Sequence, residues 1–330
     1  MPPLLHRDRY TSIRMVNVFF ALTEEFNSDG VIALLASGQA VVFYRIALMS
    51  KDGDWVLRET ESACRRGRSV LASHGARYRP GAPLDPRWLA GGWSCHFEFF
   101  DDKKRRIRCD FVSRPPRIPA ADLGTMFSAA RGEGALRVVD PERLVLLKQT
   151  QRAKDYPVIG ELARLLPPQS ERELTTDPDR ILELAMAAVG DSARESVRLA
   201  RLGRSREEVV AALAGEVDRL QRADRARMQR YEGAAQSYLA EFRATVPIEA
   251  PLEDAHVVAV SLAERSLPTT LEGGHPDADA ERGRPRPQGN DGRGAGTRVG
   301  SLVRSGAIDQ RRGSALLTRS PHGPRPRPYE

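Results

Sequence analysis

Ser37-Gly38-Gln39, followed by Lys51-Asp52-Gly53-Asp54-Trp55, is the stretch that decides the fold of this 330-residue chain. In an extended strand alternate side chains share a face, so Asp52 and Asp54 project together, and Gly53 and Trp55 point the other way. The apolar run 31–36 predicts a strand, and residues 39–44 predict a buried helix. We expect Ser37 to cap that helix and the neighbouring glycine to let a phosphate approach its free N–H groups.

A third carboxylate, Asp110, lies in the strand-like run 106–112. The apolar residues at 107, 109 and 111 share one face of this strand, so Asp110 points away from the apolar face. On a neighbouring strand it would complete, with Asp52 and Asp54, an oxygen-rich site of the kind that holds Mg²⁺ against phosphates. Two simpler interpretations stay open: residues 51–54 can form a hairpin turn, and Asp110 can pair with Arg108 or Arg114.

Asp140-Pro141 predicts a helix start, with an N-cap followed by proline at the first helical position. On that helix Lys148, Arg152 and Asp155 follow at i, i+4 and i+7 and share one face. Taken alone, this spacing is typical of a solvated, salt-bridged stripe.

The order of these features resembles the DNA polymerase β-like nucleotidyltransferase superfamily. The similarity is greatest to the compact bacterial branch that includes toxins of toxin-antitoxin and abortive-infection systems, and it covers residues 16–166. The resemblance implies that three Asp residues bind metal and carry catalysis, that a Ser-Gly turn holds the triphosphate, and that a later Lys contacts the phosphates. The residues that would fill these roles here are Asp52, Asp54, Asp110, Ser37, Gly38 and Lys148.

The resemblance implies an enzyme that uses two Mg²⁺ ions to move a nucleoside monophosphate from an NTP to an acceptor. The acceptor would be an RNA such as tRNA, a protein or a small molecule, and the enzyme would be a toxin with a cognate antitoxin. Two residues depart from the family pattern: Gly53 stands where an apolar residue is usual, and Gln39 where some members have a second small residue.

Because glycine loosens a strand, Gly53 favours a second hypothesis, a catalytically inactive module that binds nucleotide or a partner. Mg²⁺-dependent NTP binding without pyrophosphate release would separate this module from the enzyme. A third hypothesis, a basic RNA-binding helical protein, requires RNA affinity that persists after the tail is removed.

The chain divides into three predicted parts. Residues 1–170 form an α/β (α+β) nucleotidyltransferase-like domain, with a mixed sheet flanked by helices. Helices at 181–189, 192–202, 205–220 and 223–242 form a second domain, 171–264. Residues 265–330 contain 8 of the 23 Pro, 11 of the 27 Gly and a net charge of +5 out of +7, which predicts a disordered tail.

Three cysteines without Cys-x-x-Cys spacing argue against a disulfide framework and predict a cytoplasmic protein. The N-terminus has no apolar signal region, and the apolar run 31–49 contains Ser37, Gln39 and Arg45, so we expect no membrane partner.

Overall fold

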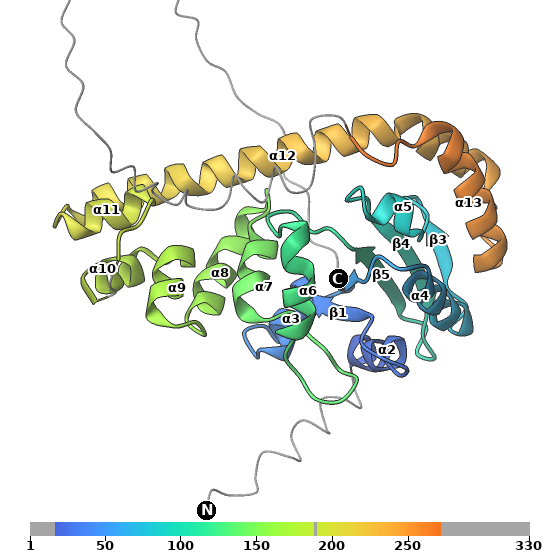
Figure 1. Ribbon diagram of the computed structural model, residues 1–330, viewed down its shortest axis with the longest axis horizontal. Helices are drawn as coiled ribbons and strands as arrows, with labels where there is room; N and C mark the ends of the chain where they lie inside the picture. The colour runs from blue at the N-terminus through green and yellow to red at the C-terminus, as the bar shows by residue number, and fades with distance from the viewer. Residues whose placement is uncertain (1–16, 188–189, 272–330) are drawn as a thin grey trace, which may run out of the picture. The chain divides into compact units, whose positions relative to one another are not determined.

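The structure is a computed structural model and describes residues 17–187 and 190–271. All of these residues belong to one compact unit. A mixed sheet with flanking helices comes first and a helical region follows (Figure 1), which confirms the predicted fold class. The division into domains at residues 170 and 264 stays a prediction. Most of the predicted tail, residues 272–330, lies outside the described residues.

One five-stranded sheet contains the predicted carboxylates, with strand order β1-β2-β5-β4-β3. Strands β2 and β5 pair in parallel, and the other three pairs are antiparallel. The β4–β5 pair is the hairpin that the sequence predicts around residues 101–104. The strands are β1 (Ala33–Ala36), β2 (Asp52–Leu57), β3 (Arg77–Arg79), β4 (Cys95–Phe100) and β5 (Arg106–Val112).

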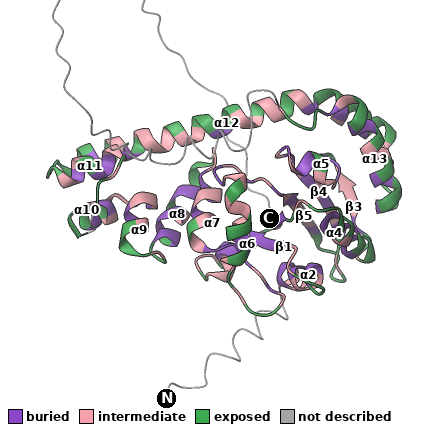
Figure 2. Ribbon diagram, viewed as in Figure 1, coloured by how far each residue is buried: buried purple, intermediate pink, exposed green. Residues whose placement is uncertain are grey.

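The core lies on one face of the sheet, because burial alternates along β2, β4 and β5. Trp55 and Phe111 are fully buried there and stack with ring centroids 5.4 Å apart. Phe26 of α2 (Val18–Phe26) meets both rings edge-on. Helix α4 (Glu61–Ser73) packs on α2. Strand β1 is buried throughout (Figure 2), whereas buried and half-buried residues alternate along β4 and β5. The half-buried face is therefore left for polar chemistry.

The region 75–92, which its Gly and Pro content predicts as a loop, contains a strand and a short helix. Strand β3 has only three residues, Arg-Tyr-Arg, which is too short for a periodic signal. Helix α5 (Pro86–Leu89) starts at an Asp85 N-cap whose side chain accepts from the Arg87 N–H. The prediction of a plain loop was therefore wrong, because edge pairing and capping override the composition here.

Helix α7 (Pro141–Lys148) begins as predicted, with Asp140 accepting from the Arg143 N–H. It ends at Lys148 and does not continue to residue 155. The Thr150 N–H donates to the Lys148 carbonyl oxygen (2.8 Å) in a turn, and the Gln151 N–H donates to Asp224 (2.8 Å). The other short elements between β5 and α10 are η1 (Ala120–Asp122), α6 (Leu123–Ser128), η2 (Ala153–Asp155), α8 (Tyr156–Ala163) and α9 (Pro168–Leu174).

The helical region consists of α10 (Pro178–Ala187), α11 (Glu195–Arg201), α12 (Arg206–Thr245) and α13 (Leu252–Ser266). The capping box of Ser205 and Glu208 is present. Instead of the two helices expected at 205–220 and 223–242, α12 is one helix of 40 residues. Gln221 and Arg222 at the expected junction are both good helix formers, so nothing interrupts the helix.

Helix α13 returns to the sheet domain and contacts β3 and α4 (Figure 1). It includes residues 265 and 266, which were expected in the tail. The indoles of Trp88 and Trp93 donate to the carbonyl oxygens of Leu267 (3.0 Å) and Pro268 (2.8 Å). Within residues 17–187 and 190–271, no helix combines the length and apolarity needed to cross a bilayer.

Candidate active site

Strands β2 and β5 place the three predicted aspartates on the polar face of the sheet. Asp54 on β2 lies directly opposite Asp110 on the parallel strand β5. Asp52 shares the face of Asp54 two residues earlier and lies opposite Arg108. The interpretation of residues 51–54 as a hairpin turn is therefore wrong, because Asp52 to Asp54 pair within the sheet.

Gly53 is required by its packing. A Cβ atom at this position would lie 2.4 Å from the Trp55 ring and 2.5 Å from the ring of Phe19. The backbone of β2 therefore approaches both rings as closely as only glycine allows. The presence of glycine at this position in β2 therefore has a packing reason, the two aromatic rings against its Cα.

The electrostatics of Asp54 set it apart from the other carboxylates. Its pKa is raised from 3.8 to about 6, first by burial, then by the charge of Asp110 and, less strongly, by that of Asp52. A hydrogen bond from the Ser37 side chain and the charge of Lys148 act in the opposite direction. The pKa of Asp54 therefore depends on four of the other predicted site residues.

Ser37 does not cap the helix as expected. It is the first residue of α3 (Ser37–Phe43), it has a left-handed φ of 49°, and Ala36 occupies the N-cap position. Its side chain bonds Asp54 instead. A Cβ atom on Gly38 would lie 2.2 Å from Ser50 Oγ, so this glycine makes room for the loop before β2.

Gln39 fixes the same loop. Its side chain is buried, donates to the Ser50 carbonyl oxygen (2.8 Å) and accepts from Asn17 (3.0 Å). These bonds hold the end of the loop that leads into Asp52.

Lys148 lies buried beside the carboxylates, and its ammonium group pairs with Asp155 (3.3 Å). Asp155 also accepts from Thr150 (2.8 Å) and Arg152 (2.8 Å). Burial alone would raise the pKa of Asp155, but the charge of Lys148 and these bonds hold it below its usual value of 3.8. Lys148, Arg152 and Asp155 therefore meet, although through a turn and not along one helix face.

The segment before α7 places this helix against the sheet. The Leu35 N–H donates to the Arg137 carbonyl oxygen (2.8 Å), and the Val139 N–H donates to that of Leu35 (2.9 Å). The Tyr44 hydroxyl also donates to the Val139 carbonyl oxygen (2.8 Å). Residues 137–139 thus extend the sheet beside β1 and carry Asp140, the N-cap of α7.

Asp110 has partners that the sequence did not reveal. Its Oδ1 lies 2.7 Å from His96 Nδ1 and 3.5 Å from Arg79 Nη1. The suggested pairing with Arg108 or Arg114 is not what the structure shows, because Arg108 approaches Asp52 (3.7 Å) and Arg114 pairs with Glu59. The alternation of polar Ser94, His96 and Glu98 with apolar neighbours was the signal that could have found this contact.

These contacts belong to two rows of charged residues that cross four strands. One row, in register across β2, β5, β4 and β3, is Asp54, Asp110, His96 and Arg79. The second row, on the same face, is Asp52, Arg108, Glu98 and Arg77.

The three aspartates supply the oxygen donors that Mg²⁺ prefers, and Asp54 and Asp110 are adjacent. They are not gathered around one point: among the described residues, no group of three or more His, Cys, Asp or Glu side chains is arranged to hold a metal ion. The donor chemistry therefore fits a cation best at the Asp54–Asp110 pair, where it would also offset their repulsion.

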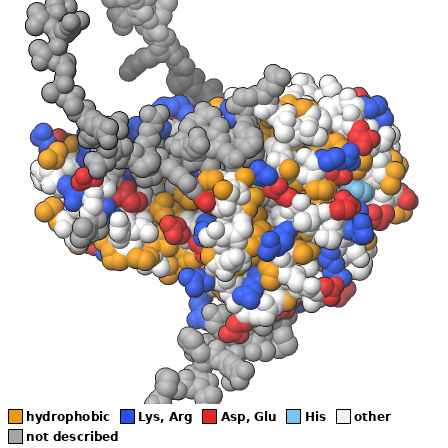
Figure 3. Space-filling view, viewed as in Figure 1, with side chains coloured by type: hydrophobic (Ala, Val, Ile, Leu, Met, Phe, Trp, Pro, Cys, Tyr) orange, Lys and Arg blue, Asp and Glu red, His pale blue; other side chains and the backbone are white. Residues whose placement is uncertain are grey.

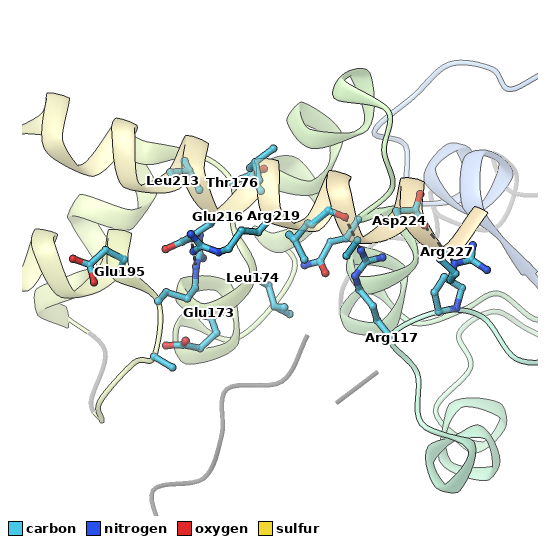
Figure 4. A pocket seen from close by; sticks show the side chains of 17 residues that line it. Arg117, Glu173, Leu174, Thr176, Glu195, Leu213, Glu216, Arg219, Asp224 and Arg227 are labelled. Carbon is cyan, nitrogen blue, oxygen red and sulfur yellow. Dashed lines mark hydrogen bonds and ion pairs between the residues drawn. The ribbon is translucent and has the colours of Figure 1, made fainter. Parts of the chain in front are cut away.

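A separate cavity of about 840 Å³ is lined by α12, the end of α9 and the start of α11 (Figure 4). Gln149, next to Lys148, is in its wall, but of the described residues that line it none is a predicted site residue. Both acidic and basic side chains line it, and Arg194 pairs with Glu216 (2.8 Å). Its lining charges are therefore largely balanced.

No protein-family model and no curated protein sequence matches this chain. The solved structures that resemble it include two proteins from H. pylori. One is a protein from H. pylori provisionally named a nucleotidyltransferase, with a TM-score of 0.34 and 14% identity over 63% of this chain and 94% of that chain. The other is JHP933 from Helicobacter pylori, with a TM-score of 0.34 and 13% identity over 64% of this chain and 92% of that chain. Likeness at this level carries no information on chemistry.

The three cysteines are free and buried, and burial raises the pKa of each thiol, to about 12 for Cys64. These thiols are protonated at neutral pH and contribute no nucleophile to the site.

Proposed function

We propose that this protein is a metal-dependent nucleotidyltransferase that moves a nucleoside monophosphate from an NTP to a hydroxyl or phosphate acceptor and releases pyrophosphate. The observation that carries the proposal is the pairing of Asp54 with Asp110 across parallel strands, with Ser37 and Lys148 acting on the same carboxylate. Carboxylates, a hydroxyl and a buried ammonium group from distant segments rarely converge without a ligand to bind.

Asp54 and Asp110 would hold Mg²⁺, with Asp52 on the same face available for a second ion. Bound there, Mg²⁺ would neutralise charge on the triphosphate. The chain itself would supply the Lys148 ammonium group for a phosphate oxygen, and the turn at Ser37 and Gly38 would position the phosphates. Asp155 keeps the Lys148 side chain in place through its 3.3 Å ion pair.

The acceptor is part of the proposal: RNA such as tRNA, a protein or a small molecule. A toxin role with a cognate antitoxin rests on the family resemblance alone. The third hypothesis, a basic RNA-binding helical protein, gains no support from the face drawn in Figure 3, where basic and acidic side chains are interspersed.

A second candidate function, the catalytically inactive binding module, is favoured by one observation. Asp52 and Asp110 already have cationic partners on the chain, Arg108 and Arg79. If these ion pairs persist in the complex, the carboxylates bind a nucleotide without completing a catalytic site.

Thermal melts with Mg²⁺ and each NTP test the proposal, together with pyrophosphate release and transfer of α-labelled nucleotide to RNA or lysate. We expect a rise in Tm, release of pyrophosphate, and loss of labelling in Asp110→Ala. Asp102→Asn, on the exposed turn between β4 and β5, is the matched control and should behave as wild type. Nucleotide binding without pyrophosphate release would establish the binding module, and no ligand-dependent shift would refute both.

A further inference from the structure

Ser94, His96 and Asp110 form a hydrogen-bonded chain on the polar face of the sheet. Ser94 Oγ lies 3.0 Å from His96 Nε2, and His96 Nδ1 lies 2.7 Å from Asp110 Oδ1. The three side chains come from the segment leading into β4 and from the adjacent strand β5, where His96 is directly opposite Asp110. All three are half-buried, so solutes can reach them.

The partners determine which nitrogen of the imidazole carries the proton. An ionised carboxylate only accepts hydrogen bonds, so His96 Nδ1 donates to Asp110. In the neutral ring Nε2 then has a free lone pair, and the Ser94 hydroxyl donates to it. A hydroxyl, an imidazole and a carboxylate in this order are the arrangement that activates a serine nucleophile.

The backbone is adapted to this arrangement. A Cβ atom on Gly81 would lie 2.5 Å from His96 Cδ2, so only glycine leaves room for the ring. The Ala82 N–H donates to the Ser94 carbonyl oxygen (3.0 Å), which fixes the serine backbone. His74 offers a comparison: it contacts Glu25 at the same 2.7 Å, but the described residues place no serine hydroxyl on its ring.

We propose that Ser94 is a self-modification site that accepts a nucleoside monophosphate, with His96 as the base and Asp110 as the residue that orients it. This inference rests on the proposed function, because the electrophile is the α-phosphate of an NTP held at Asp54 and Asp110. One imidazole ring and two hydrogen bonds separate Ser94 Oγ from the Asp110 carboxylate.

In the reaction the Ser94 hydroxyl proton passes to His96 Nε2 while the oxygen attacks the α-phosphorus. The new O–P bond forms as the bond between the α-phosphorus and the bridging oxygen breaks, and pyrophosphate leaves with that oxygen. No electrons are gained or lost. Arg79, opposite His96 on β3, brings a cation next to the transferred phosphoryl group.

The test is intact-mass spectrometry of the full chain incubated with Mg²⁺ and each NTP, followed by peptide mapping. We expect the mass of one nucleoside monophosphate on Ser94, no adduct in Ser94→Ala, and a rate at least about 100-fold lower in His96→Gln. His74→Gln is the matched control and should label at the wild-type rate. Melting curves of the variants show whether each one folds.

A second arm uses a fluorophosphonate probe with no nucleotide or metal. An activated Ser94 reacts with this probe in wild type and in His74→Gln, but not in His96→Gln. If NTP binds and pyrophosphate is released while Ser94 reacts with neither reagent, or if the adduct maps elsewhere, the inference is overturned and the proposed function stands. If Ser94 reacts with the probe but no Mg²⁺-NTP shifts the melt, the proposed function fails and the nucleotide adduct fails with it.

Discussion

Replacing Asp54 with Asn should stabilise the protein without ligand, and by an amount that depends on pH. The folded state holds the pKa of this carboxyl at about 6, against 3.8 ordinarily. At 1.36 kcal/mol per pKa unit, ionising Asp54 destabilises the folded protein by at most about 3 kcal/mol. The side chain is half-buried, and water screens part of the effect, so we expect about 1–2 kcal/mol.

The sign follows from proton linkage. Between pH 3.8 and about 6 the folded protein binds this proton more tightly than the unfolded chain does, so the contribution of Asp54 lowers stability as the pH rises through this range. The advantage of Asp54→Asn should therefore be close to zero at pH 3.8 and complete above pH 6.

Urea unfolding at several pH values measures this difference, with Asp102→Asn as the control on an exposed carboxylate. Saturating Mg²⁺-NTP should reverse the order, because only wild type then gains binding energy. A stability advantage of Asp54→Asn that is the same at every pH, or a variant less stable than wild type at pH 8, would refute the argument that burial and charge repulsion destabilise the ionised Asp54 carboxylate.

Three further changes test other parts of the site and its support. Lys148→Met should lower the free energy of unfolding by about 2 kcal/mol, because it leaves the buried Asp155 with fewer partners. Urea unfolding should show that this loss of stability shrinks below pH 3.8, where the Asp155 carboxyl is protonated in the unfolded chain. Gly53→Ala should lower stability by about 1–3 kcal/mol through the clash with the Trp55 ring, whereas Gly124→Ala, with open space around it, should not lower the Tm. A chain ending at residue 264 should melt well below one ending at 271, because it lacks the two carbonyl groups that accept from the indoles; equal melting temperatures would show that these contacts are dispensable.

Local sequence patterns were sufficient to predict a helix or strand where they contained both a residue that marks its end and a regular spacing of apolar residues. The alternation in 106–112 and the Asp140-Pro141 start are local signals, and β5 and α7 occupy those places. Strand β3 could not be predicted, since three residues on an edge strand give no periodicity and owe their conformation to β4. The turn after Lys148 includes a hydrogen bond to Asp224 of α12, 73 residues away, which no local pattern contains.

For the candidate site, the sequence predicted which face of its strand each carboxylate occupies, but it did not predict which residues lie next to these carboxylates. Period-two alternation puts Asp54 and Asp110 on polar faces, and their adjacency then depends on a parallel pairing that only the fold supplies. The roles of His96 and Arg79 could not be predicted from the sequence, because their contacts with Asp110 run across strands. The packing role of Gly53 could not be predicted for a related reason: strand propensity describes the backbone, whereas the rings packed against this glycine are a tertiary feature.

Among the strands of residues 17–187 and 190–271, β5 comes last in sequence and yet lies at the centre of the sheet. Until it is synthesised and inserted, the β1–β2 pair and the β3–β4 pair have no strand in common, and each presents an open edge. A nascent chain that ends before Arg106 therefore exposes two surfaces that can pair with other chains, which makes it prone to aggregation. Since Asp54 and Asp110 meet only when β5 closes this gap, ligand binding at the pair reports that the whole sheet has formed.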